Sequence, residues 1–321
     1  MMKTKRLVAA VAAFVTAFAA FGTVALAEDA PAAVSPVAVD GMNFPDAYFR
    51  AYVKTNFDTN SDGVLSAEEM AAVKKIDLRK AKKVSRLKGI GNFKNLEKLN
   101  CSGTNAGSFN VSANTKLTYI NCSSTKASTI VTAGDAALST LICENSRIKK
   151  LDLTGNTALK KLDASGNKKL AAIDMSNNTA LTSIDLSFTA IGRLDVSKMA
   201  GLKTLYCTAA GLTSLTTGAN TKLTLLDCSS NSLKKLDVTG CTALKDLYVY
   251  LNRLTKLDLS KCTALRELDC SENRLKALNV SACKKLGMVF ATANKFKKMT
   301  VAKGVNTSKY FVDKKVKFVK K

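Results

Sequence analysis

Oxygen-bearing side chains stand at every second position of a short segment near the N-terminus. Asp58, Asn60 and Asp62 alternate along the chain, Gly63 follows directly, and Glu69 closes the segment. The spacing D-x-N-x-D-G-x5-E is typical of a twelve-residue loop that wraps around a divalent cation. Hard oxygen donors with three formal negative charges suit Ca²⁺. The expected ligands, through side-chain, carbonyl or water-mediated oxygens, are Asp58, Asn60, Asp62, Val64, Ser66 and Glu69.

Helices are expected on both sides of this loop. Apolar residues between Pro45 and Phe57 recur at helical spacing, and Ser66 with Glu69 forms a capping box that begins a second helix. The segment resembles an EF-hand, and the resemblance implies calcium. A dockerin is the competing family, but dockerins contain two such loops and we find one. We expect residues 44–75 to form a small helical cap stiffened by calcium.

The rest of the chain is repetitive. Nine intervals separate the recurring leucines; eight measure 21 residues, and one, from Leu159 to Leu181, measures 22. The leucines are Leu96, Leu117, Leu138, Leu159, Leu181, Leu202, Leu223, Leu244, Leu265 and Leu286. One such unit cannot bury its own leucines, so we expect stacked coils that share a core. About ten coils at roughly 4.8 Å each predict a solenoid about 50 Å long.

The run from Leu265 to Leu275 has the form L-x-x-L-x-C-x-x-N-x-L. This is similar to the leucine-rich repeat, and Leu87–Ile90 resembles the entry coil of secreted bacterial internalin-like repeats. The resemblance implies an α/β repeat solenoid with short parallel strands over residues 76–302. The second half of each unit also alternates apolar and polar residues, as strands do. Either a horseshoe or a straighter, two-faced array fits this pattern.

Two kinds of residue recur at fixed positions of the repeat. Asparagines lie eight residues after the coil start, where their amides can satisfy turn backbone groups from coil to coil; they are Asn167, Asn231, Asn252, Asn273 and Asn294. All nine cysteines fall at two positions that other apolar or asparagine residues also occupy. An odd number in interchangeable positions predicts buried free thiols rather than disulfides.

The first residues predict export. A basic start, the apolar stretch from Leu7 to Leu26 and small residues before Glu28 are typical of a cleaved signal peptide over residues 1–27; an uncleaved anchor is the alternative. Residues 28–43 are expected to be a linker. No later stretch is apolar enough to span a membrane. We expect a secreted or cell-surface-associated protein. The chain has no histidine, so Ser-His and Cys-His catalytic pairs are excluded, and we expect no enzyme.

Positive charge is concentrated at the ends of the repeat. The formal net charge is +24, and residues 284–321 contain 12 lysines and one acidic residue, Asp313. We expect residues 303–321 to form a basic capping strand or tail, with lysines that prevent further pairing. A contact with an anionic polymer, such as wall teichoic acid, lipopolysaccharide or lipid head groups, is the alternative. Nucleic acid is not expected to be a partner of an exported protein.

Aromatic and acidic residues alternate four residues after successive coil starts. We expect Tyr206, Asp227, Tyr248, Asp269 and Phe290, with Tyr250 beside Tyr248, to share one outward face. Rigid aromatic side chains among acids suit a partner-binding strip, whereas ordinary strand-surface filling is the competing interpretation. We therefore expect a binding protein that mediates protein–protein interaction or adhesion. The alternative is a structural cell-envelope protein that binds anionic wall polymer through its basic ends.

Overall fold

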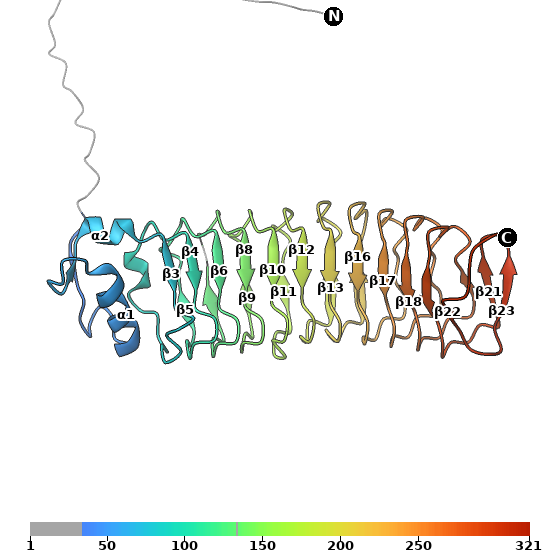
Figure 1. Ribbon diagram of the computed structural model, residues 1–321, viewed down its shortest axis with the longest axis horizontal. Coiled ribbons are helices and arrows are strands. Elements are labelled where there is room, and N and C mark those ends of the chain that lie inside the picture. The colour runs from blue at the N-terminus through green and yellow to red at the C-terminus, as the bar shows by residue number, and fades with distance from the viewer. Residues whose placement is uncertain (1–33, 133) are drawn as a thin grey trace, which may run out of the picture. The chain divides into compact units, whose positions relative to one another are not determined.

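The computed structural model describes residues 34–132 and 134–321, and residues from Ser35 onward form one compact unit. The expected signal peptide and the first part of the expected linker lie outside these residues. Within the unit, the coils stack side by side along one axis, from β3 to β23 (Figure 1). None of the helices in the described part of the chain is long and apolar enough to cross a membrane.

Two helices precede the coils. They are α1 (Ala47–Phe57) and α2 (Ala67–Ala72), and the antiparallel pair β1 (Val37–Ala38) and β2 (Val64–Leu65) ties the segment together. Asp46 caps α1 by accepting from two backbone amides, and the predicted capping box begins α2. Phe44 joins this segment to the coils. The centre of its ring lies 6.0 Å from that of Phe49 in α1 and 6.3 Å from that of Phe93. Phe93 directly follows the short 3-10 helix η1 (Ile90–Asn92).

One strand of every coil belongs to a continuous parallel sheet, here called the main ladder. Each strand pairs in register with the next, so equivalent residues of successive coils lie side by side. The 12 strands of this sheet in the described residues are β3 (Lys75–Asp77), β4 (Lys98–Asn100), β6 (Tyr119–Asn121), β8 (Thr140–Ile142), β10 (Lys161–Asp163), β12 (Ser183–Asp185), β14 (Thr204–Tyr206), β16 (Leu225–Asp227), β17 (Asp246–Tyr248), β18 (Glu267–Asp269), β20 (Met288–Phe290) and β22 (Tyr310–Phe311).

The expected solenoid is therefore present but longer than about ten coils. The repeating leucines mark the ten inner strands, from β4 to β20. The first and last coils begin at Val73 and Thr307, so a search for leucines misses them. Residues 303–321, expected as one capping strand or tail, contribute β22 to the main ladder and β23 (Lys317–Lys320) to the opposite side.

The opposite side of the coils also consists of strands, and we call it the second ladder. Unlike the main ladder, it is interrupted into separate sheets. Its remaining strands are β5 (Phe109–Asn110), β7 (Ile130–Val131), β9 (Leu151–Asp152), β11 (Ile173–Asp174), β13 (Arg193–Asp195), β15 (Ser214–Thr216), β19 (Leu278–Asn279) and β21 (Lys298–Val301). The expected α/β class is thus met only by the two α-helices that precede the coils, because the described coils contain strands and no α-helix. Strands on both sides give similar spacing between coils, and the array lacks a strong bend (Figure 1).

Apolar side chains and turn amides hold the coils together. The coil-start leucines are fully buried, or nearly so, in one continuous core. The predicted asparagine role is confirmed: Asn252 Nδ2 donates to Cys228 O of the preceding coil at 2.9 Å, and its Oδ1 accepts from Leu233 N at 2.9 Å. The same pattern recurs at Asn231 and Asn273.

A second amide position bridges the coils at the opposite turn. Asn114, Asn156, Asn178 and Asn220 each donate to two carbonyls of the preceding coil. Asp135 occupies the same position between Asn114 and Asn156, where it is buried and neither carboxylate oxygen has a hydrogen-bond partner. Burial raises the pKa of Asp135 from 3.8 to about 7. A charged carboxylate cannot donate to turn carbonyls, so this coil junction lacks its bridge.

Replacing Asp135 with asparagine should stabilise the fold at neutral pH and above. A satisfied amide in place of a buried unpaired carboxyl is expected to raise the free energy of unfolding by about 1–3 kcal/mol. In the parent chain, the contribution of Asp135 is fully present below pH 3.8 and is lost as pH rises through about 7, because the folded state holds the proton more tightly. Urea denaturation of the parent and the variant at pH 5 and pH 8 measures the free energy of unfolding. If that free energy depended on pH in the variant as it does in the parent, the assigned role of Asp135 would be wrong.

Candidate functional site

The expected calcium loop lies between α1 and α2, and its oxygens mainly bind the loop's own backbone. Asp62 Oδ1 accepts from Val64 N at 2.8 Å, and Asp58 Oδ2 accepts from Gly63 N at 3.1 Å. Glu69 accepts from both the backbone and the hydroxyl of Thr59 at 2.6 Å and from Ser66 N at 2.9 Å. These hydrogen bonds, from the Thr59 hydroxyl above all, lower the pKa of Glu69 to about 2.

Whether these residues fit a cation depends on their free oxygens. Across the described residues, no three acidic or thiol side chains are gathered closely enough to form a metal-holding group. However, Asp58 Oδ1 is buried without a hydrogen-bond partner, and Asn60 and Asp62 remain exposed beside it. Ca²⁺ prefers carboxylate and amide oxygens as ligands, so a carboxylate oxygen without a hydrogen-bond partner beside further side-chain oxygens fits this ion chemically. The second helix of the motif is only six residues long, shorter than its EF-hand resemblance implies.

The aromatic and acidic residues expected on one face do form a column across the main ladder. Register pairs Tyr206 with Asp227, Asp227 with Tyr248, Tyr248 with Asp269 and Asp269 with Phe290. Tyr250 follows β17 and is half-buried. The column continues to Phe311, whose ring stacks on Phe290 at 4.9 Å with an interplanar angle of 10°. We call Tyr206, Asp227, Tyr248, Tyr250, Asp269, Phe290 and Phe311 the aromatic–acidic strip.

Sequence reasoning missed Phe311, although it lies 21 residues after Phe290 and the period alone could have found it. It is the most exposed aromatic ring of the strip, at 48%. Tyr206 is exposed as well, at 36%. Partial burial, followed by the nearby carboxylates of Glu267 and Asp246, raises the pKa of Tyr248 to about 12. The hydroxyl of Tyr248 therefore remains a neutral hydrogen-bonding group at physiological pH.

The acids of the strip also have a structural role. Asp227 Oδ1 accepts from Ser229 N at 3.0 Å, and Asp269 Oδ1 accepts from the backbone and hydroxyl of Ser271. Such contacts fix the turn that follows each strand. The aromatic rings have no comparable role in the turns, so they are the stronger candidates for contact with a partner.

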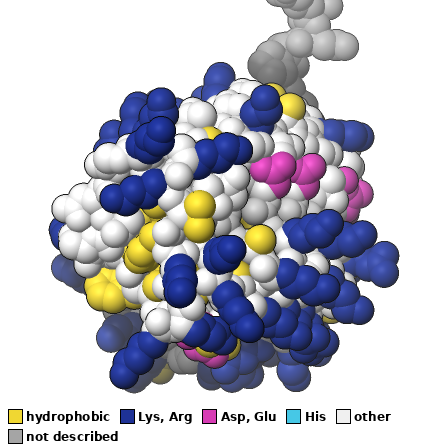
Figure 2. Space-filling view, turned by 90° about the vertical axis from the view of Figure 1, so that its right-hand side faces the viewer, with side chains coloured by type: hydrophobic (Ala, Val, Ile, Leu, Met, Phe, Trp, Pro, Cys, Tyr) yellow, Lys and Arg dark blue, Asp and Glu magenta, His cyan; other side chains and the backbone are white. Residues whose placement is uncertain are grey.

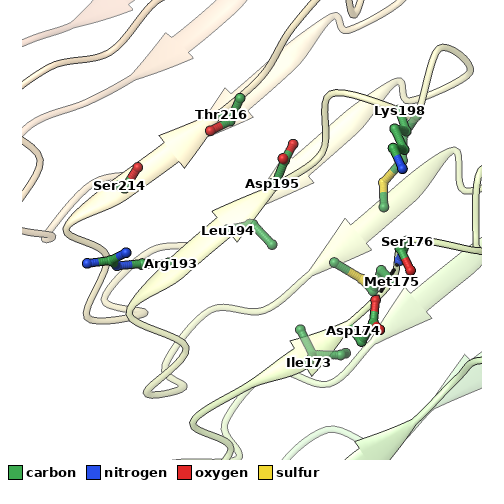
Figure 3. Close-up of a pocket in the computed structure, with 11 residues that line it drawn as sticks. Ile173, Asp174, Met175, Ser176, Arg193, Leu194, Asp195, Lys198, Ser214 and Thr216 are labelled. Atoms are coloured by element: carbon green, nitrogen blue, oxygen red, sulfur yellow. Dashed lines mark hydrogen bonds between the residues drawn. The ribbon is translucent and has the colours of Figure 1, made fainter.

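A pocket of about 430 Å³ opens on the second ladder, between β11 and β13 (Figure 3). These strands are not paired, and Met199 occupies the amide position that bridges coils elsewhere. Hydrogen bonds from Ser176 lower the pKa of Asp174, and those from Ser197 lower the pKa of Asp195. Lys198 lies close enough to contribute to both shifts, so the pocket presents both charges.

The cysteines form columns inside the coils. All nine are buried and free, which confirms the predicted burial. Cys101, Cys122 and Cys143 occupy three successive coils beside the main ladder, and Cys207, Cys228 and Cys270 occupy the same position further along. Cys241, Cys262 and Cys283 continue the second asparagine position, where the thiols of Cys262 and Cys283 donate to carbonyls of the preceding coil at 3.6 Å.

The C-terminal end of the array is strongly basic. Basic side chains surround the end face and only a few acidic groups are visible there (Figure 2). Exposed lysines on this end include Lys314, Lys317 and Lys320, and Asp313 is half-buried beside Lys315 at 4.0 Å. This surface is the one expected to meet an anionic polymer in the alternative interpretation.

Solved structures identify the architecture. The functional domain of InlJ from Listeria monocytogenes, described as including a cysteine ladder, matches with a TM-score of 0.64 and 26% identity, over 89% of this chain and 71% of that chain. An internalin, inlF, from Listeria monocytogenes matches with a TM-score of 0.57 and 18% identity, over 90% and 98%. The leucine-rich-repeat domain of APL1B matches with a TM-score of 0.60 and 17% identity, over 71% and 75%. No protein-family profile and no curated protein matches the chain.

The fold of this chain is similar to that of internalin-type leucine-rich-repeat solenoids. The leucine-rich-repeat resemblance of the sequence is therefore confirmed at the level of architecture. Calcium binding and export are separate matters, on which a shared solenoid has no bearing.

The buried thiols should be unreactive until the protein unfolds. Burial raises the pKa of Cys101 and Cys143 to about 12, so almost no thiolate exists at neutral pH. We expect a thiol reagent such as DTNB to label fewer than one group per native molecule at pH 8 and all nine in denaturant. Rapid labelling of two or more groups in the native protein would contradict the buried arrangement.

Proposed function

We propose that this protein is a secreted or cell-surface binding module that captures a protein partner across the main ladder. The single observation that supports it most is the aromatic–acidic strip, an in-register column of exposed and half-buried rings on one sheet. Aromatic side chains supply large contact areas with little loss of conformational entropy on binding. The fold similarity to internalins and to other leucine-rich-repeat proteins favours interaction over catalysis.

The cysteine columns support a rigid scaffold for that role. The description of InlJ includes a cysteine ladder, and in this chain three successive coils place thiols at one inward position. Thiols that fill a core position without a charge contribute packing rather than redox chemistry. A binding surface benefits from such rigidity because less order has to be imposed when the partner binds.

We further propose that Ca²⁺ stiffens the N-terminal segment. Asp58, Asn60, Asp62, Val64, Ser66 and Glu69 would hold the ion, and the orphaned Asp58 oxygen is the feature that supports this. Since Tyr52 Oη accepts from Asp77 N at 3.2 Å, the helical segment contacts the first strand of the main ladder directly. Calcium at the loop would then limit fraying of the first coil.

A second candidate function is that of a structural envelope protein that binds anionic wall polymer. The dense lysine surface of the C-terminal end favours it (Figure 2). Binding of this kind depends strongly on ionic strength, whereas capture through aromatic rings does not. Salt extraction of envelope fractions separates the two functions, because release by salt alone favours the polymer.

The strip is tested by the double substitution Tyr206→Ala and Tyr248→Ala. Loss of two of its rings is expected to weaken partner capture by at least about 30-fold, the cost of roughly 2 kcal/mol typical of a hot spot. Pull-down from host and envelope fractions measures capture, and thermal unfolding checks the fold. Tyr119→Ala is the matched control, since Tyr119 lies on the same sheet but outside the strip. Undiminished capture by the double variant would reject the strip.

The calcium loop is tested by thermal unfolding with and without a chelator. Calcium in excess should raise the melting temperature by a few degrees, as for a ligand that binds only the folded state. Glu69→Gln keeps one oxygen that can accept from Ser66 N in the helix cap but removes the charge, and it should abolish the calcium response. Glu68→Gln, on the neighbouring exposed residue, is the control. A melting temperature that does not change with calcium would rule out the capping role.

A further inference from the structure

A cationic pocket lies in the third to fifth coils of the array, well before its basic C-terminal end. It occupies the turns that lead from the main ladder to β7, β9 and β11, and has a volume of about 670 Å³. Its lining residues are Lys126, Ser128, Ser146, Arg147, Lys149, Gly166, Lys168 and Lys169. Five of these eight are basic and none is acidic. The aromatic–acidic strip lies in different coils, from β14 to β22.

The repeat itself brings these cations together. Lys126, Arg147 and Lys168 stand at 21-residue intervals, so they follow one another in successive coils about 4.8 Å apart. The backbone fixes the first two, through Lys126 N to Ala106 O at 2.9 Å and Arg147 N to Ala127 O at 3.0 Å. The 22-residue coil adds Lys169 directly after Lys168, which doubles the charge at that turn.

No acidic partner neutralises this group. All five basic side chains are exposed, and none of them takes part in the four ion pairs found among the described residues. Asp152, on the strand that follows Lys149, is engaged elsewhere, because its Oδ1 accepts from the backbone of Thr154 at 3.1 Å and from its hydroxyl at 2.7 Å. Five close positive charges repel one another, and bound anionic groups would relieve that repulsion.

We propose that this pocket binds the phosphate or sulfate groups of a flexible anionic polymer that has no nucleobases. Arg147 can bind an oxyanion through two parallel hydrogen bonds, while the four lysines act as point charges along the polymer. A volume of about 670 Å³ and three successive coils suit several linked anionic groups rather than one. The lining contains no aromatic residue, so nucleobases would find no ring on which to stack.

The full chain is titrated with fluorescently labelled linear polyphosphate at several salt concentrations. The variant Arg147→Gln/Lys168→Gln/Lys169→Gln is expected to bind about tenfold more weakly, as three solvent-exposed charge contacts allow, and with a shallower salt dependence. The control Lys203→Gln/Lys222→Gln/Lys245→Gln removes equal charge from exposed positions outside both the pocket and the C-terminal end, and it should stay within about twofold of the parent. Equal losses in both variants would show binding by net charge and overturn the proposal.

Further titrations identify the anionic group. Inorganic phosphate alone should bind far more weakly than polyphosphate, and dextran sulfate compared with polyphosphate distinguishes sulfate from phosphate. Single-stranded RNA that bound as tightly as polyphosphate, with the same loss in the pocket variant, would overturn the assignment to a polymer without bases. Thermal unfolding checks that both variants fold. Capture through the aromatic–acidic strip should persist in the pocket variant, so failure here is distinguishable from failure of the proposed function.

Discussion

Each coil depends on its neighbour for both its apolar core and its turn hydrogen bonds. A segment of 21 residues cannot enclose its own leucines. Its turn carbonyls accept hydrogen bonds from the asparagine side chain of the next coil. In-register pairing of the main ladder adds a third connection of the same kind. Because all three require the same alignment, a residue's position in the repeat determines where its side chain lies.

This rule explains how much the sequence could predict. The coil boundaries, the turn asparagines, the buried cysteines and the column from Tyr206 to Phe290 all follow from the 21-residue period, and the structure has them in those positions. The terminal coils could not be found in the same way, since Val73 and Thr307 replace the marker leucine. Strands on the second side could be suspected from alternation, but their interruptions depend on packing between particular coils.

The interactions of the charged residues were harder to predict than the fold. Formal charge suggests that lysines and nearby aspartates neutralise each other, yet most of these aspartates bind the serine or threonine two residues ahead. The lysines beside these aspartates therefore take part in none of the ion pairs among the described residues, and a pocket such as that around Arg147 becomes visible only in three dimensions. Asp135 is a similar case. The sequence shows its position in the repeat, but only the structure shows that its buried carboxylate has no hydrogen-bond partner.

The junction between β11 and β13 has a consequence for how the array folds. Since each coil contacts only its neighbours, the cooperativity of such a protein is a chain of nearest-neighbour couplings. At this junction the second ladder is not paired and Met199 offers no amide, so the coupling there rests on the pairing of β10 with β12 in the main ladder and on the apolar core. The solenoid is thus continuous in shape but uneven in coupling, because this step has fewer connections than the next one, where β13 pairs with β15 and Asn220 bridges the coils.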